Sequence, residues 1–281
     1  MISKERMEDL IQGVEIEVFP SIDSTNSEAK RRAMEGAALP LLVCAEEQSA
    51  GRGRLGRSFY SPSKSGLYMS LAFEAKGSMA DAVTVTSAAA VAVAESIELL
   101  CARDCLIKWV NDIYVDGRKV CGILTEAVHG ERIVIVVGIG INCTTQEFPS
   151  EIKDRAGSVG EVDRSCLAAA VAKKLLYYCD ALSERKWIDE YRRRSLVLGE
   201  KINYTEGGEV KSALAVAIDE NGGLVIVDFR TDRAQSGEEL AEKYKDQLGI
   251  YRRCLAEVLD IPVKETVIYS FRLGKCIEIC P

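Results

Sequence analysis

Apolar and polar residues alternate along residues 14–19, Val-Glu-Ile-Glu-Val-Phe, with the two-residue period of a β-strand that has one solvent-facing side. A Ser/Thr/Asn cluster at residues 24–27 precedes Ala-rich sequence, and it predicts a helix that begins there and extends to about residue 34. The Ala/Val/Leu-rich stretch 81–101 predicts a long, nearly buried helix. Further apolar runs predict buried strands at residues 41–45, 67–73, 106–110, 113–115, 120–126 and 133–142.

The pattern changes along the C-terminal third of the chain. Helices are expected at about 165–183 and 185–194, and short β segments with Gly-rich turns at 207–208 and 221–223 then suggest a small barrel. A helical stretch at 238–259 precedes two expected strands at 263–270 and 275–279. The prediction is an α+β protein with a mixed sheet covered by helices in residues 1–194, a small β module in 195–237 and a helix-strand extension in 238–281.

Charge and composition narrow the classes of function. The chain has 281 residues, 36 Lys+Arg against 43 Asp+Glu, and a formal net charge of −7. That balance excludes a general nucleic-acid binder, so an anion site must be built locally. Its start is charged and lacks the apolar core of a signal peptide, and nowhere do 18 consecutive apolar residues occur. A cytoplasmic protein with no membrane association is therefore expected.

Cysteine and histidine usage excludes several site chemistries. Ten Cys are scattered, often within apolar runs, which suits reduced, buried thiols rather than a disulfide framework. His129 is the single histidine and no C-x-x-C pair exists, so a zinc site or a His-dependent triad has little support.

The segment 51–57, Gly-Arg-Gly-Arg-Leu-Gly-Arg, concentrates three glycines and three arginines. Clustering Arg52, Arg54 and Arg57 costs repulsion unless an anion neutralises them, and a nucleotide phosphate or pyrophosphate would do so. The spacing matches neither a Walker loop nor a Rossmann fingerprint. A solvated basic loop without a ligand is the alternative interpretation.

A second polar cluster joins residues 108–112, Lys-Trp-Val-Asn-Asp, to residues 118–122, Arg-Lys-Val-Cys-Gly, through a short strand and a turn at 116–117. A hairpin would bring its two ends together, so that two lysines, one carboxylate and one amide converge. Such a set suits polarising phosphates and holding a divalent cation or a ribose. Taken singly, these residues are more often surface charges of a hairpin.

These two clusters, together with Ser24-Thr25-Asn26, Gln48 and the segment 138–142, Gly-Ile-Gly-Ile-Asn, resemble biotin protein ligases over about residues 14–142. That family has a G-R-G-R-x-G-R loop, a K-W-P-N-D segment followed by R-K-x-x-G-I-L, and a late strand G-x-G-I-N. Two positions depart from it. Val110 replaces the usual Pro and Phe59 stands where a Trp often follows the loop; both changes should be tolerated.

The resemblance implies a class II synthetase-like catalytic domain followed by a small SH3-like module. It also implies condensation of biotin with ATP to biotinyl-5′-AMP and transfer of biotin to a lysine of a biotin carboxyl carrier protein of acetyl-CoA carboxylase or a related carboxylase. Lys119 and Arg54 would be catalytic, and Asp112 is the candidate for Mg²⁺. The biotin contacts would be Ser24, Thr25, Asn26, Gln48, Gly51, Arg52, Gly53, Arg54, Lys119 and Gly122. The ATP contacts would be Arg54, Arg57, Phe59, Lys108, Asn111, Lys119 and Asn142.

Alternatives and partners follow from the same comparison. A lipoate-protein ligase shares the fold but has a different loop, and a non-catalytic biotin or nucleotide sensor would keep the site without turnover. Repressor members carry a helix-turn-helix before the strand that matches residues 14–19. Here about a dozen residues precede it, so no specific DNA binding is expected. A homodimer through sheet edges is left open.

The tail departs from the ligase pattern after about residue 226. Residues 225–233, Val-Ile-Val-Asp-Phe-Arg-Thr-Asp-Arg, with Tyr244, Gln247 and Tyr251, resemble the end of the PD-(D/E)XK nuclease domain of RecB- and AddA-type helicase-nucleases. Arg230 replaces the lysine of that family and the upstream metal-binding Asp is missing. Our hypothesis is a catalytically dead remnant that packs as an extension. An accidental match within an unrelated elaboration is the alternative.

Overall fold

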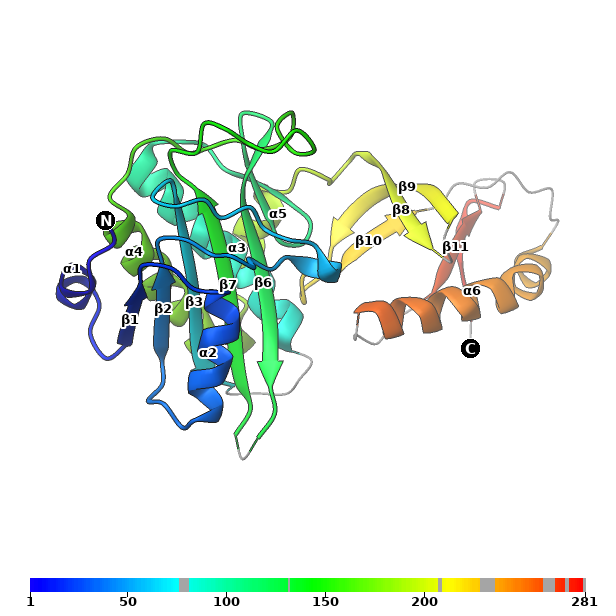
Figure 1. Ribbon diagram of the computed structural model, residues 1–281. Coiled ribbons are helices and arrows are strands. Elements are labelled where there is room, and N and C mark those ends of the chain that lie inside the picture. Colours follow the sequence, from blue (N-terminus) through cyan, green and yellow to red (C-terminus); the bar gives the residue numbers. More distant parts are fainter. Residues whose placement is uncertain are drawn as a thin grey trace. The chain divides into compact units, whose positions relative to one another are not determined.

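A seven-stranded mixed sheet forms the body of the first of two units, Met1–Val227 and Asp228–Pro281, in the computed structural model (Figure 1). The structure describes residues 1–75, 81–130, 132–206, 209–227, 236–259, 266–270 and 273–279. Only the β1–β2 pair is parallel. In spatial order the strands are β1 (Glu15–Phe19), β2 (Leu41–Ala45), β3 (Gly66–Glu74), β7 (Val134–Asn142), β6 (Arg118–Val128), β5 (Asp112–Val115) and β4 (Leu106–Lys108).

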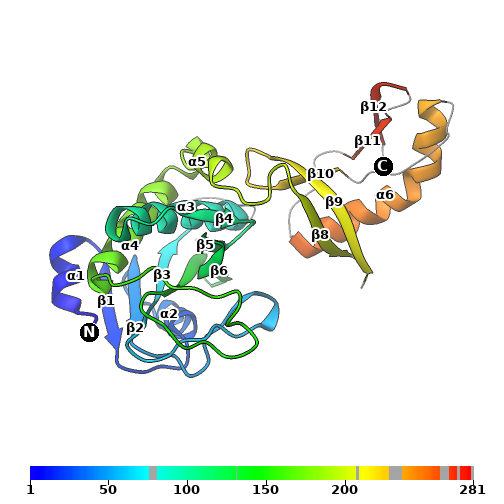
Figure 2. The ribbon, with the colours of Figure 1, turned by 90° about the horizontal axis from the view of Figure 1, so that it is seen from above.

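Helices cover both faces of this sheet, so the central strands β2, β3 and β7 are buried along nearly their whole length. Helix α2 (Thr25–Met34) lies on one face, and α3 (Asp81–Cys101) and α4 (Arg164–Asp180) lie on the other (Figure 2). Helix α1 (Lys4–Leu10) packs against α4, and the short helix α5 (Ile188–Arg193) packs against α3. The predicted α+β class, with helices on a mixed sheet, is confirmed.

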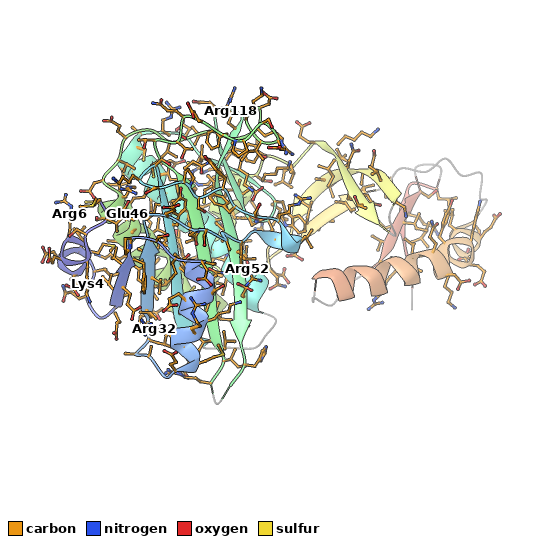
Figure 3. The ribbon with its side chains drawn as sticks, viewed as in Figure 1. Lys4, Arg6, Arg32, Glu46, Arg52 and Arg118 are labelled. Atoms are coloured by element: carbon orange, nitrogen blue, oxygen red, sulfur yellow. The ribbon has the colours of Figure 1, made fainter. Side chains whose placement is uncertain are left out.

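Local side-chain contacts fix the element boundaries. The Ser24 side chain caps α2 by accepting a hydrogen bond from the Ser27 N–H, as the Ser/Thr/Asn cluster predicts. Asp163 caps α4 in the same way. Glu46, labelled in Figure 3, follows β2. A buried ion pair of 2.8 Å between Glu46 and Arg164 of α4 joins the sheet to the helical layer. The charge of each side chain is neutralised where little water reaches it.

Three sequence predictions differ from the structure. Helix α1 was not predicted, because its seven residues carry one buried side chain, Met7, and little amphipathic pattern. The strand expected over 106–110 ends at Lys108, since Trp109 and Val110 enter the turn that leads to β5. The helices expected at 165–183 and 185–194 are α4, a 3₁₀ turn (Leu182–Glu184), and α5.

A three-stranded antiparallel sheet follows in the same unit, with β9 (Glu209–Ile218) between β8 (Lys201–Glu206) and β10 (Leu224–Val227). The predicted turn at 221–223 is confirmed: Gly222 has φ +85°, and one Asp219 carboxylate oxygen accepts hydrogen bonds from the N–H groups of Asn221 and Gly223. The turn expected at 207–208 lies outside the described residues. The Trp109 indole N–H donates to the Gly222 carbonyl at 2.9 Å, so this turn braces the segment before β5.

The second unit consists of α6 (Gly237–Leu259) and a hairpin of β11 (Val267–Ser270) and β12 (Lys275–Glu278). Leu240 of the helix packs with Ile277 and Ile279 in a small core of its own. The expected helix and both expected strands are present where the chain is described. Residues 228–235, which carry most of the nuclease-like motif, lie outside the described residues.

One helix among the described residues is long and apolar enough to cross a membrane by length and composition alone, over Thr84–Cys101 of α3. It is 72% buried within the protein. Since it lies between the sheet and α4, it is weak evidence for a membrane span.

Candidate active site

A row of directly opposed residues crosses five neighbouring strands of the main sheet. Its members, from β3 to β4, are Tyr68, Gly140, Gly122, Asp112 and Lys108. Residues opposite one another in register project to the same face of a sheet, so the row presents two charged side chains beside two positions without a side chain. The two segments that the sequence singled out, 108–112 and 118–122, therefore meet on one face, as the hairpin predicts.

The two glycines of this row are required by an aromatic ring. A Cβ atom at Gly140 would lie 2.5 Å from the Phe59 ring, and one at Gly122 would lie 3.2 Å from it. Phe59 also contacts Tyr68 edge-on, with 6.5 Å between ring centroids. The residue in the position of the family's usual Trp thus covers a glycine floor made by β6 and β7.

A hydrogen-bond network continues this face toward α2. The Gln48 side-chain oxygen accepts from both the backbone N–H and the hydroxyl of Thr25, at 2.8 and 3.1 Å. Ser70 of β3 donates to the Asn26 side-chain oxygen at 2.6 Å. Gly138 makes room for that amide, because a Cβ there would lie 1.9 Å from the Asn26 oxygen. Thr25, Asn26 and Gln48 are therefore brought together, as the sequence predicts, and their orientations are fixed by bonds to one another and to the sheet.

The arginine loop folds back on itself over this region. The Gly53 N–H donates to the Arg57 carbonyl and the Phe59 N–H donates to the Gly51 carbonyl, around a tip at Leu55 that is 87% exposed. Arg52 forms an ion pair of 3.3 Å with Glu126 of β6. Figure 3 labels Arg52, and also Arg118 at the start of β6.

One of the three arginines already has a carboxylate partner within the protein. Arg52 pairs with Glu126, which it shares with Lys30. Arg54 instead donates to the Asn111 side-chain oxygen at 3.3 Å. Among the described residues, neither Arg54 nor Arg57 forms an ion pair, so these two guanidinium groups are the ones available to an anion.

The hairpin of β5 and β6 contains the shortest ion pair among the described residues of the site. Lys119 Nζ lies 2.7 Å from one carboxylate oxygen of Asp112. The turn that aligns them has left-handed backbone at both Asp116 and Gly117, with φ of +50° and +74°. The second Asp112 oxygen is buried and has no hydrogen-bond partner among the described residues. A buried carboxylate oxygen without a donor is costly, and it is suited to a cation.

Two of the residues assigned to ATP have other partners as well. The Asn142 amide donates to the Gly157 carbonyl at 3.0 Å, and the Gly157 N–H donates to the Lys119 carbonyl at 2.9 Å. Asn142 thus secures the segment that flanks Lys119. Lys108 Nζ lies 5.9 Å from the ring centroid of Tyr114.

Sequence reasoning missed Ser61, Ser70, Glu126, Gly138 and Gly140 as parts of this face. Ser61 belongs to it because its hydroxyl accepts a hydrogen bond from the Gln48 amide at 2.9 Å. The two glycines were visible in the segment 138–142, because a period of two places both on one side of a strand. Ser70 and Glu126 gave no comparable indication, since each is an ordinary polar residue within a strand. Only strand pairing shows their position.

The described cysteines are reduced and mostly lie in the core. All eight described cysteines are free, and most are buried. Burial raises the pKa of the Cys44 and Cys143 thiols to about 12, and it raises that of Cys121 well above its ordinary value. A thiol that holds its proton is a poor nucleophile, so the predicted role as reduced core residues fits.

A cavity of about 500 Å³ lies elsewhere, lined by Lys64, Cys143, Thr144, Glu161, Val162, Asp163 and Arg164. None of the predicted site residues lines it. The candidate site is therefore defined by the convergence of charged and polar side chains on the sheet, and not by this cavity.

Comparisons with known proteins agree with this geometry. Residues 18–142 match the model of the biotin/lipoate A/B protein ligase family. The chain is 31% identical over 223 residues to a biotin–[acetyl-CoA-carboxylase] ligase of Paracoccus denitrificans, covering 73% of this chain and 90% of that protein. A structure of a biotin protein ligase from Aquifex aeolicus in complex with biotin and ATP superposes with a TM-score of 0.67 and 27% identity, over 75% of this chain and 91% of that one.

The fold and the polar face of the sheet thus define a domain of the biotin/lipoate ligase class. Within that class, the chain belongs to the biotin–[acetyl-CoA-carboxylase] ligase family. It is also 40% identical over 144 residues to a bifunctional ligase/repressor of Bacillus spizizenii, and this match spans 44% of that protein's length.

A separate similarity concerns another class of protein. The chain is 42% identical over 72 residues to an ATP-dependent helicase/nuclease protein of Lachnoclostridium phytofermentans. This match covers 25% of the chain and 5% of that protein. The resemblance to a helicase-nuclease is confirmed, whereas the loss of nuclease activity stays a hypothesis, which Mg²⁺-dependent DNA cleavage that disappears in Asp228→Ala would contradict.

Proposed function

We propose that the chain is a biotin protein ligase, which condenses biotin with ATP to biotinyl-5′-AMP and passes the biotinyl group to one lysine of a carrier protein. The proposal rests on the row Lys108, Asp112, Gly122 and Gly140. This row brings segments 108–112 and 118–122 together on one face of the sheet, under the arginine loop. Family membership supports the same function.

The biotin half of the site would use the network around Gln48. Ser24, Thr25, Asn26 and Gln48 would hydrogen-bond the ureido head, for which their interlocked bonds provide a pre-organised set of donors and acceptors. Phe59 lies over the glycine floor, so its ring would border both the apolar ring system of biotin and the nucleotide. Further contacts would come from the loop and its neighbours, namely Gly51, Arg52, Gly53, Arg54, Lys119 and Gly122.

The nucleotide half would use the cations. In the first step a biotin carboxylate oxygen bonds to the α-phosphorus of ATP while the bond to the bridging oxygen breaks and pyrophosphate leaves. Lys119 would stabilise the negative charge that grows on the α-phosphoryl oxygens, and Arg54 would retain the adenylate. Arg57, Phe59, Lys108 and Asn111 would position the rest of the nucleotide. Asn142 would act through the loop that flanks Lys119.

In the second step the uncharged amine of the carrier lysine attacks the acyl carbon of the adenylate, the bond from that carbon to the phosphate oxygen breaks, AMP leaves, and the nitrogen gives up one proton as it becomes the amide. Both steps need orientation and charge stabilisation rather than a histidine base, in agreement with a chain that has a single histidine. The proposed partner is a biotin carboxyl carrier protein of acetyl-CoA carboxylase or a related carboxylase. We further propose that the protein acts in the cytoplasm, and that a homodimer, if it forms, pairs at a sheet edge such as β1.

The residues present fit Mg²⁺ as a companion of ATP. The partnerless oxygen of Asp112 would be one ligand, and Mg²⁺ in such sites takes its others from phosphates and water. The described residues hold no group of three or more His, Cys, Asp or Glu that could bind a metal ion on its own. Asp112 would therefore hold a cation that arrives with the nucleotide, which neutralises phosphate charge when bound.

The proposal is tested by pyrophosphate release from ATP in the presence of biotin, lipoate or neither. We expect release with biotin only, and a mass increase of one biotinyl group on a purified carrier domain, lost when its acceptor lysine is replaced by arginine. Release with lipoate alone would assign the chain to the lipoate-protein ligases. Binding of biotin without release of pyrophosphate would indicate a non-catalytic biotin sensor. Repeating the transfer with a chain that ends near residue 237 asks whether the second unit contributes.

Replacing Gly140 by alanine should weaken biotin binding by about tenfold, which is the scale of one lost good contact. The added Cβ would meet the Phe59 ring at 2.5 Å, so the ring must leave the glycine floor. Isothermal titration with biotin measures the effect. Gly130→Ala is the matched control, since the contact nearest to its added Cβ is an ordinary 3.8 Å. An unchanged affinity of Gly140→Ala for biotin would show that the position of the Phe59 ring does not affect biotin binding.

A further inference from the structure

The carboxylate of Glu126, on β6, accepts contacts from three side chains, two from α2 and one from the arginine loop. Lys30 of α2 lies 2.9 Å from one carboxylate oxygen, and Arg52 of the arginine loop lies 3.3 Å from the same oxygen. The other oxygen accepts from the Asn26 amide at 2.9 Å. Glu126 is thus the group in the described part of the chain at which the loop, α2 and β6 are joined by charge.

The environment keeps this carboxylate ionised. Partial burial opposes ionisation, but the hydrogen bonds from Lys30 and Asn26 and the charge of Arg52 prevail and lower the pKa of Glu126. Its side chain is 21% exposed, so these contacts are only partly screened by water. The two cations, Lys30 and Arg52, share the single negative charge of Glu126. Removing either cation therefore changes the electrostatic interaction of the other with this carboxylate.

The two cations differ in how firmly they are held. Lys30 is 23% exposed and bonds at 2.9 Å, whereas Arg52 is 48% exposed and pairs at the longer 3.3 Å. Lys30 alone neutralises the carboxylate, so Arg52 can move without leaving an unpaired buried charge. The backbone of Arg52 also forms an antiparallel β-bridge with Ser58, the residue before Phe59.

We propose that Glu126 is a positioning residue for biotin: it orients the Asn26 amide and holds the arginine loop down on the sheet through Arg52, with Lys30 as the permanent counter-charge. Asn26 is held at its oxygen by Ser70, and at its nitrogen by Glu126 at 2.9 Å and by the Leu124 carbonyl at 3.3 Å. The carboxylate is the nearer of the two acceptors and the charged one, so it makes the stronger contribution to the orientation of the amide. This inference rests on the proposed function, because it concerns the same biotin site.

Glu126→Gln preserves the shape of the side chain but removes its charge. The KM for biotin should rise about tenfold, as expected from losing one charge-assisted hydrogen bond, while kcat stays within about twofold. The adenylate should also dissociate faster, because the loop is no longer tied to β6. Glu17→Gln is the matched control. It breaks a partly buried pair of 3.1 Å between Glu17 and Arg32, outside the site.

A double-mutant cycle identifies the partner through which Glu126 acts. Glu126→Gln and Arg52→Met should each raise the KM for biotin, and the double variant should be little worse than either one. Lys30→Met should lower the melting temperature more than it changes this KM, because Lys30 fastens α2 to β6. Additive effects of Glu126→Gln and Arg52→Met, or a KM effect reproduced in full by Lys30→Met, would overturn the proposal.

Wild-type turnover separates the two levels of inference. If the wild-type protein releases no pyrophosphate with biotin, the proposed function fails. If it turns over, and Glu126→Gln has the KM of the wild type, only the role of Glu126 fails. Circular dichroism and the melting temperature of each variant show whether it is folded, so a loss caused by unfolding is recognised as such.

Discussion

Lys119→Ala is expected to reduce the rate of adenylate formation about a thousandfold while biotin still binds. Removing one preorganised donor at a site where charge develops costs roughly 10²–10³ in rate, and Lys119 supplies a full charge. Its Nζ is held 2.7 Å from Asp112, so the amine is in place before ATP arrives. Single-turnover release of pyrophosphate measures the rate, and isothermal titration with biotin measures binding.

The controls for this prediction separate charge from position. Lys4→Ala removes a lysine of α1 that is 53% exposed and, in the part of the chain that the structure describes, forms an ion pair with Glu8 alone, so it should change neither quantity. Asp112→Asn should leave Lys119 charged but free to move, and it should slow the reaction less than Lys119→Ala. If Lys119→Ala forms the adenylate within tenfold of the wild-type rate, Lys119 is not a catalytic residue.

Arg54→Gly should release biotinyl-5′-AMP into solution and label proteins indiscriminately. Arg54 belongs to the exposed loop, with the Asn111 amide as its hydrogen-bond partner, and it forms no ion pair among the described residues. Its guanidinium is therefore available to the negatively charged adenylate. We expect the adenylate to dissociate at least tenfold faster, because a charge-assisted contact of about 1.5–3 kcal/mol is lost.

The measurement is biotin incorporation into bovine serum albumin, which has no carrier sequence, together with the dissociation rate of purified adenylate. Arg132→Gly is the matched control, since Arg132 lies outside the site and donates to the Ala37 carbonyl. Retention of the adenylate by Arg54→Gly as tightly as by the wild type would show that this arginine has another role.

Much of the architecture was predictable because it depends on local sequence. The period of two at residues 14–19, the Ser/Thr/Asn cap of α2 and the Asp116-Gly117 turn each act within a few residues, and all three features are present. Helix α1 was not predictable in this way. It is held by tertiary contacts, such as the buried Met7 and the pairing of Arg6 with Asp163, and by little intrinsic pattern.

The candidate site also combines features that local sequence predicts with contacts that depend on the tertiary structure. The residue types and their spacing in the arginine loop and in the two halves of the hairpin were sufficient to indicate phosphate chemistry. They could not show that Arg52 has a carboxylate partner within the protein, because Glu126 is 74 positions away from Arg52 and belongs to a strand whose register depends on its neighbours.

The sequence by itself therefore determined the order of elements after helix α1, the hairpin that joins Asp112 to Lys119, and the residue types that the loop brings together, since each depends on residues near one another in the chain. The tertiary structure alone decided that Gly122 and Gly140 lie side by side beneath Phe59, that Ser70 donates to Asn26, and that Glu126 pairs with Arg52 of the loop. The physical reason is that strand pairing and helix packing bring together residues that local propensity leaves unrelated.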